Sequence, residues 1–137
     1  MGYRIFDHTA DLGVEVNAAT REELYADAVV ALFDLLTEPS LVRPETGREM
    51  VVNGKDPADL LVNLLREALY LWNGDGWLAK TCTVRQVDAR QVTALLHGEF
   101  FDPARHRIKR EIKAVTYHQA SVEQGGDGWK ARIVFDV

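Results

Sequence analysis

The residues best suited to chemistry lie near the two ends of the chain. His8 and Asp11 fall within the stretch FDHTADLGVEV at residues 6–16, and Asp136 is followed by Val137. Hard divalent cations such as Ca²⁺ and Mg²⁺ prefer oxygen ligands, and the Asp136 side chain, a main-chain oxygen and the terminal carboxylate of Val137 could supply several from one place. Asp11 would complete this metal site if the first hairpin and the last strand are neighbours in the sheet. The alternative is an ordinary turn aspartate and a solvated chain end.

His8 and His118 form a second candidate pair, because imidazole rings act as general bases and as metal ligands. Histidines in a turn and in a strand are more often structural residues that make hydrogen bonds. The sequence contains no nucleophile elbow, P-loop, dinucleotide fingerprint, HExxH helix or spaced Cys/His set. The single cysteine, Cys82, excludes an intramolecular disulfide and is expected to be a small buried residue rather than a nucleophile.

Length and charge limit the classes of protein to which the chain can belong. A chain of 137 residues, 47% of them hydrophobic, can bury one core, so we expect a single domain over residues 1–137. The net charge of −5 argues against strong direct binding to nucleic acid. One segment is an exception, because residues 105–113 are either a solvated loop or a patch that docks an anionic partner. Its basic residues, opposed only by Glu111, are Arg105, Arg107, Lys109, Arg110 and Lys113.

Membrane and secretory segments are not expected. The longest uninterrupted apolar run, residues 28–33, is far shorter than the roughly 20 residues needed to cross a bilayer. The start MGYRIFDH lacks the basic and apolar regions of a signal peptide. These features predict a soluble cytoplasmic protein.

The hydrophobic pattern predicts an α+β fold. Capping signals favour one helix after Thr20, ending near residue 38, and a second that begins at Asp56-Pro57 and ends near residue 74. Alternating residues favour strands at residues 3–6, 12–16, 46–53, 81–87, 92–100, 115–124 and 129–137. Two helices that each bury one stripe, packed on a mostly antiparallel sheet, predict a two-layer domain. The alternation places Asp11 and Asp136 on the polar side of their strands.

Several motifs, in this order, resemble the archease family over nearly the whole chain. They are HTAD at 8–11 with the following LGVEV, ALFDLLTE at 31–38, LLVNLLREALYL at 60–71, EIKAVTYH at 111–118 and the final Asp136-Val137. The resemblance implies an α+β fold built from a duplicated strand-helix-strand-strand module. It also implies a protein that is not itself an enzyme. Archeases are cofactors of the RtcB-type RNA ligase, which joins RNA ends carrying a 3′-phosphate or cyclic phosphate in tRNA splicing and RNA repair.

The same resemblance implies roles for individual residues. The family's metal ligands fall on Asp11, Asp136 and Val137, and the expected cofactor is a divalent cation, Ca²⁺ first, with Mg²⁺ or Mn²⁺ as alternatives. The basic residue of the KAVTYH motif falls on Lys113, which is expected to contact the ligase or its nucleotide. His8 and His118 match motif positions and are expected to support the structure or hold the metal ligands in place.

Two other functions stay open from the sequence. In the first, the protein is a small metal-dependent phosphoesterase in which Asp11 and Asp136 hold the cation and His8 is the general base. In the second, the protein is a chaperone-like modulator of a tRNA cytosine methyltransferase, a partner with which some archeases have been linked.

Overall fold

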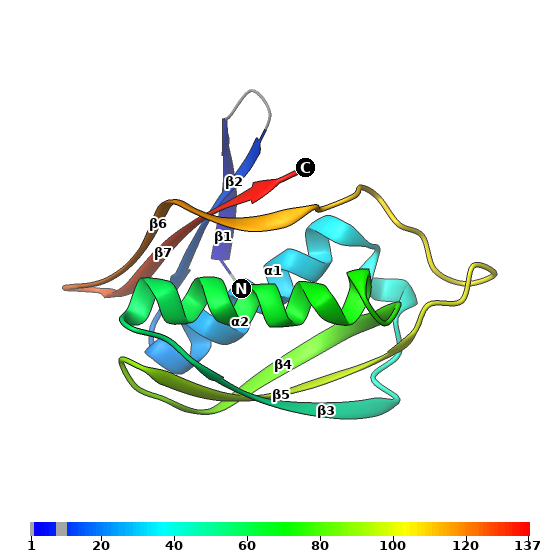
Figure 1. The fold of residues 1–137 in the computed structure, drawn as a ribbon, viewed down its shortest axis with the longest axis horizontal. Coiled ribbons are helices and arrows are strands. Elements are labelled where there is room, and N and C mark those ends of the chain that lie inside the picture. The colour runs from blue at the N-terminus through cyan, green and yellow to red at the C-terminus, as the bar shows by residue number, and fades with distance from the viewer. Residues whose placement is uncertain (1, 8–10) are drawn as a thin grey trace.

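The computed structural model describes residues 2–7 and 11–137 of the chain (Figure 1). Two long helices and seven strands confirm the α+β class. The helices are α1 (Arg21–Leu36) and α2 (Pro57–Asn73), with a short 3-10 turn at Pro39–Leu41. The strands are β1 (Gly2–Asp7), β2 (Asp11–Ala18), β3 (Thr46–Asn53), β4 (Trp77–Val87), β5 (Gln91–Phe100), β6 (Ala114–Gly125) and β7 (Gly128–Asp136).

The seven strands form two antiparallel sheets, where the sequence pattern had suggested one. The first has the order β1-β2-β7-β6 and the second the order β3-β5-β4. In Figure 1 both helices lie between the two sheets. A helix in that position must be apolar on more than one side. This explains why α1 buries Ala26, Val29 and Phe33 in addition to a stripe of leucine and alanine, where the sequence predicted one buried stripe. The stripe consists of Leu24, Ala28, Ala31, Leu32, Leu35 and Leu36.

The topology contains the duplicated module that the family resemblance implied. One copy is β2-α1-β6-β7 and the other is β3-α2-β4-β5, which is inserted between α1 and β6. The strand order β2-β7-β6 in one sheet corresponds to β3-β5-β4 in the other. The helices are exchanged, since α1 packs chiefly on β4 and α2 chiefly on β6. The two copies therefore share one core, and the repeat exists in the topology without a residue-level repeat in the sequence.

Local signals at the start of each helix are confirmed. The Thr20 hydroxyl accepts a hydrogen bond from the Glu23 amide at 3.1 Å, and an Asp56 carboxylate oxygen accepts one from the Asp59 amide at 2.8 Å. These bonds satisfy amide groups that have no partner within the helix. Within the described residues, no helix is both long and apolar enough to span a bilayer.

Replacing Thr20 with alanine is expected to lower the free energy of unfolding by about 1 kcal/mol, because the Glu23 amide loses its acceptor. Urea denaturation followed by circular dichroism would measure the change. The Thr20→Ser variant keeps the hydroxyl and serves as the matched control. Equal losses in the two variants would show that the methyl group of Thr20, rather than its hydroxyl, matters.

Candidate metal centre

Asp11 and Asp136 are directly opposite each other on neighbouring strands. Asp11 begins β2, Asp136 ends β7, and the antiparallel register pairs their Cα atoms. The Cβ atoms of such partners are typically about 4.5–5.5 Å apart. The adjacency on which the predicted metal site depends, and which residue spacing could not establish, is therefore present.

Both carboxylates belong to the face of the sheet that points away from the core. Side chains alternate between the two faces of a strand, and in β2 the buried Val14 and Val16 point inward, which leaves Asp11 on the outer face. In β7 the buried Ile133 and Phe135 point inward, which leaves Asp136 outward. The two aspartates thus share one face as well as one register position.

A second acidic residue on the same face has basic partners. Glu15 is paired across the strands with Arg132, at 3.7 Å, and also contacts Arg4 of β1 at 3.4 Å. Burial would raise the pKa of Glu15, but the hydrogen bond and charge of Arg4, together with the charge of Lys130, outweigh burial and lower it. The sheet therefore compensates its buried glutamate with opposite charges.

The aspartate pair has no such compensation among the described residues, where neither carboxylate makes a hydrogen bond or ion pair. Like charges directly opposite each other destabilise a sheet. A bound cation would relieve that repulsion, and carboxylate oxygens are the donors that Ca²⁺, Mg²⁺ and Mn²⁺ accept. The residues present therefore fit the cation that the sequence analysis expected.

Further protein ligands are limited at this end of the sheet. The main-chain oxygen of Asp136 already accepts a hydrogen bond from the Lys113 amide at 2.7 Å. Within residues 2–7 and 11–137, no group of three or more His, Cys, Asp or Glu side chains is placed to hold a metal. Val137, which follows Asp136 and is 39% exposed, could add a main-chain oxygen.

Lys113 lies beside the aspartate pair, but its side chain is on the other face of the sheet. Its amide bonds to Asp136, which fixes its position along the strand. Two residues later Val115 is buried in the core, so Lys113 points toward the helices, as the groove that it lines with Tyr70 of α2 shows. Lys113 is exposed, and its side chain lies on the side of the sheet opposite the carboxylates. Its expected contact with the ligase or its nucleotide stays a prediction.

Of the two candidate histidines, only His118 lies within the described residues. His8 lies outside the described residues, as does its predicted pairing with His118. His118 is exposed in β6, between Thr116 and Ser121, where the register with β7 shifts and Gln119 has a φ of 57°. Neither aspartate is a register partner of His118.

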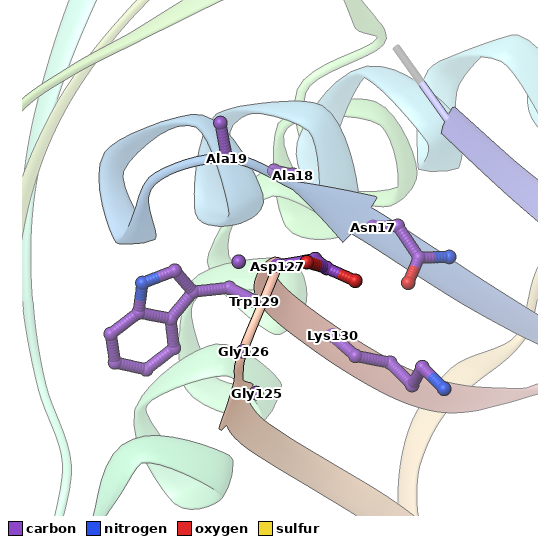
Figure 2. A pocket seen from close by; sticks show the side chains of 9 residues that line it. Asn17, Ala18, Ala19, Gly125, Gly126, Asp127, Trp129 and Lys130 are labelled. Carbon is purple, nitrogen blue, oxygen red and sulfur yellow. The ribbon is translucent and has the colours of Figure 1, made fainter.

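A pocket of about 550 Å³ lies at the opposite end of the same strands (Figure 2). It is formed by the end of β2 and the turn at residues 125–128, and Trp129 and Lys130 line it. Ala18 is seven residues from Asp11 along β2, which corresponds to roughly 24 Å. The glycine-rich turn is a tight hairpin between β6 and β7. Gly128 has a φ of 137°, and a Cβ atom there would lie 2.5 Å from the Ala18 carbonyl oxygen.

A buried ionic network, which the sequence pattern did not indicate, separates Arg105 from the rest of the basic segment. Arg105 makes two hydrogen bonds to the Glu99 carboxylate, at 2.6 and 2.8 Å, and His106 Nε2 lies 3.0 Å from the same group. The hydrogen bonds from Arg105, with further help from the Arg43 amide, hold the pKa of Glu99 well below its usual range despite burial. Arg105 is therefore structural, and nothing in its spacing distinguished it from the exposed basic residues that follow.

Cys82 behaves as a structural residue. Burial, with a smaller effect from the negative charge of Asp27, raises the pKa of its thiol to about 12. The thiol is therefore protonated at neutral pH and is a poor nucleophile.

Known proteins are similar to this chain over almost its full length. Residues 3–137 match the model of the Archease protein family (MTH1598/TM1083). Protein archease of Methanopyrus kandleri is 36% identical over 140 residues, covering 100% of both chains. Protein archease of Methanosarcina mazei is 35% identical over 139 residues, covering 98% of this chain and 95% of its own.

Solved structures show the same fold. The solution structure of Methanobacterium thermoautotrophicum protein 1598 has a TM-score of 0.83 and 28% identity, covering 99% of both chains. The crystal structure of an archease and possible chaperone from Thermotoga maritima has a TM-score of 0.62 and 23% identity, covering 96% of this chain and 94% of that one. The chain belongs to the archease family.

Proposed function

We propose that this protein is a metal-binding activator of an RtcB-type RNA ligase and is not itself an enzyme. The observation that carries the proposal is the uncompensated carboxylate pair, Asp11 and Asp136, at one end of the outer face of a sheet. Together with an oxygen of Val137, this pair would hold a divalent cation, for which Ca²⁺ is the first candidate.

The position of the pair suits presentation to another protein. In Figure 1 the hairpin of β1 and β2 projects from the body of the molecule, and the C-terminus lies beside it. A cation held there would supply a positive centre for phosphate or carboxylate groups of the ligase. The aspartates would fix its position, while the Lys113 amide holds Asp136 in register. Lys113 itself would contact the ligase or its nucleotide from the opposite face of the sheet.

An activator of this kind needs no nucleophile of its own. Cys82, the one thiol, is held protonated by burial, and the sequence contains none of the usual nucleophilic or phosphoryl-transfer motifs. The chemistry of guanylation and RNA joining would belong to the ligase. The protein would accelerate guanylation and support repeated turnover.

A reconstituted ligation assay tests this function. The reaction contains an RtcB-type ligase, GTP, a divalent cation and an RNA with a 3′-phosphate, with and without substoichiometric amounts of this protein. We expect the ligase alone to stop after about one turnover and the protein to restore continuous joining and to speed formation of the guanylated ligase. No change in either rate would contradict the proposal.

The same reagents separate the two other functions. Turnover of terminal or cyclic phosphates by this protein alone, with metal present, would identify a phosphoesterase. Co-purification with a tRNA methyltransferase instead of a ligase, together with altered methylation specificity, would identify a modulator of that enzyme.

A further inference from the structure

An exposed basic ridge, defined here as residues 107–113, follows the buried network of Glu99 and Arg105. Its four basic side chains are exposed and take part in none of the ion pairs among the described residues; they are Arg107, Lys109, Arg110 and Lys113. Only Glu111 supplies a negative charge within the ridge. The ridge is thus a local excess of positive charge on a protein whose net charge is −5.

The backbone of the ridge is fixed to the C-terminal ends of α1 and α2. Near its start, the Thr37 hydroxyl donates to the Arg107 carbonyl at 2.6 Å, and the Lys109 amide donates to the Leu36 carbonyl at 2.8 Å. Near its end, the Asn73 amide group donates to the Ile112 carbonyl at 3.1 Å, and Ile112 is fully buried. The basic side chains therefore extend from an anchored backbone, which lowers the entropy lost when an anion binds.

The ridge leads into a groove between α2 and β6. The groove has a volume of about 370 Å³, and its lining includes Arg66, Tyr70 and Lys113. Lys113 belongs to both the ridge and the groove. The Tyr70 ring is 63% exposed, so an aromatic surface lies next to the row of basic groups.

The groove is not suited to an added β-strand, although β6 is an edge strand of its sheet. Arg66 Nε donates to the Val115 carbonyl at 3.1 Å, and the Asn73 amide group occupies the Ile112 carbonyl. These side chains of α2 use acceptors that an incoming strand would need. The exposed side chains that line the groove are those of Arg66, Tyr70, Asn73 and Lys113, two of them basic and one aromatic.

We propose that the basic ridge and this groove bind single-stranded RNA, with phosphates on the ridge and one base stacked on Tyr70. Basic groups beside an exposed aromatic ring are the combination by which proteins hold single strands without reading their sequence. An acidic protein surface would use the charges but would give no role to Tyr70. The choice of RNA rests on the proposed function, in which the partner handles RNA ends.

The net charge of the chain still disfavours strong binding, so the contact is expected to be weak and sensitive to salt. Four phosphate contacts would give a slope of log affinity against log salt of about −2.8 for a single strand. The protein would then hold the RNA strand near the ligase without specifying its sequence.

Fluorescence anisotropy of a labelled, unstructured RNA oligonucleotide, titrated with the protein alone over a range of salt concentrations, tests the proposal. The Lys109→Gln/Arg110→Gln double variant should bind at least about fivefold more weakly and reduce the magnitude of the salt slope by about 1.4. Tyr70→Ala should weaken binding by about tenfold, whereas Tyr70→Phe, which keeps the ring, should bind as wild type does.

The matched control is Lys55→Gln/Arg90→Gln, which removes one exposed lysine and one exposed arginine. These residues are close together, since the Gly54 amide donates to the Arg90 carbonyl. The connections that carry them, from β3 to α2 and from β4 to β5, lie at the opposite end of the molecule from the start of β6, which the ridge precedes (Figure 1). Equal affinity and equal slope in the two double variants would overturn the proposal, as would absence of RNA binding by the wild-type protein at low salt.

Two further measurements separate this proposal from related ones. If Lys109→Gln/Arg110→Gln weakens binding to the ligase and leaves RNA binding unchanged, the ridge recognises an acidic protein surface and the RNA proposal is wrong. Stimulation of ligase guanylation by the wild-type protein is measured with GTP and no RNA. If the wild-type protein does not stimulate guanylation, the proposed function is wrong. The RNA-binding measurement is independent of that result, because it uses the protein alone.

Discussion

The Asp11→Asn variant is expected to lose stimulation of the ligase while becoming slightly more stable than the wild type in the absence of metal. Asp11 and Asp136 are cross-strand partners with no compensating charge among the described residues. Removing one of two facing charges should raise the free energy of unfolding of the metal-free protein by about 0.5 kcal/mol. The loss of a carboxylate ligand should weaken cation binding by at least about 100-fold, the upper end of the loss seen for residues that merely support a ligand.

Thermal denaturation with and without Ca²⁺, combined with the ligation assay, measures both effects. The wild-type protein should be stabilised by the cation through binding to the folded state, and the variant should not. Glu15→Gln is the control on the same face of the sheet, because Glu15 is paired with Arg4 and Arg132. This variant should be less stable than the wild type but should still be stabilised by Ca²⁺. An Asp11→Asn protein that is still stabilised by Ca²⁺ and still stimulates the ligase would remove Asp11 from the site.

Glu99→Gln is expected to give the largest loss of stability among the substitutions considered. Glu99 is buried and accepts hydrogen bonds from the Arg105 side chain and the Arg43 amide, with His106 also in contact. Breaking a buried ion pair on one side leaves the other charge without compensation, at a cost of about 3 kcal/mol. For a domain of this size, the loss corresponds to a fall in Tm of about 10 °C.

The matched control is Glu49→Gln, which breaks the exposed pair of Glu49 with Arg85 at 3.0 Å. Exposed pairs contribute little, so this variant should change the free energy of unfolding by no more than about 0.5 kcal/mol. Chemical denaturation of the two variants measures the contrast. Similar, small changes in both would show that the Glu99 network does not stabilise the fold.

The Glu99 network also predicts the acid response of the protein. Because the pKa of Glu99 is lower in the folded state than in the unfolded state, its contribution to stability is complete above the ordinary glutamate pKa of about 4.3 and is lost as the pH falls below that value. The stability difference between wild type and Glu99→Gln should therefore shrink below about pH 4.5. A difference that stays constant with falling pH would contradict the role of the ionised carboxylate.

Features set by neighbouring residues could be predicted from the sequence. Thr20 and Asp56 cap their helices because an oxygen three residues before an amide is a local arrangement. The turn after Asp88 between the predicted strands is equally local, because the Asp88 carboxylate accepts hydrogen bonds from the Arg90 and Gln91 amides. Such interactions depend on a few residues of chain and are little affected by the rest of the fold.

Features set by tertiary packing could not be predicted from the pattern of residues. The exchange of helices between the two modules decides which strand each helix covers, and it creates the groove that contains Tyr70 and Lys113. Arg105 belongs to the same run as Arg107, and only its contact with Glu99 separates the two. Asp11 and Asp136 are opposite each other because of the register between β2 and β7, two strands at the ends of the chain. The family resemblance implied that these residues lie together, but residue spacing alone could not show it.

The most direct test of the central claim is calorimetric titration of Ca²⁺ into four proteins: wild type, Asp11→Asn, Asp136→Asn and the double variant. If the two carboxylates hold one cation together, each single substitution should abolish measurable binding, and the double variant should lose nothing further. Binding that survives either single substitution, or losses that add between the two positions, would contradict the account.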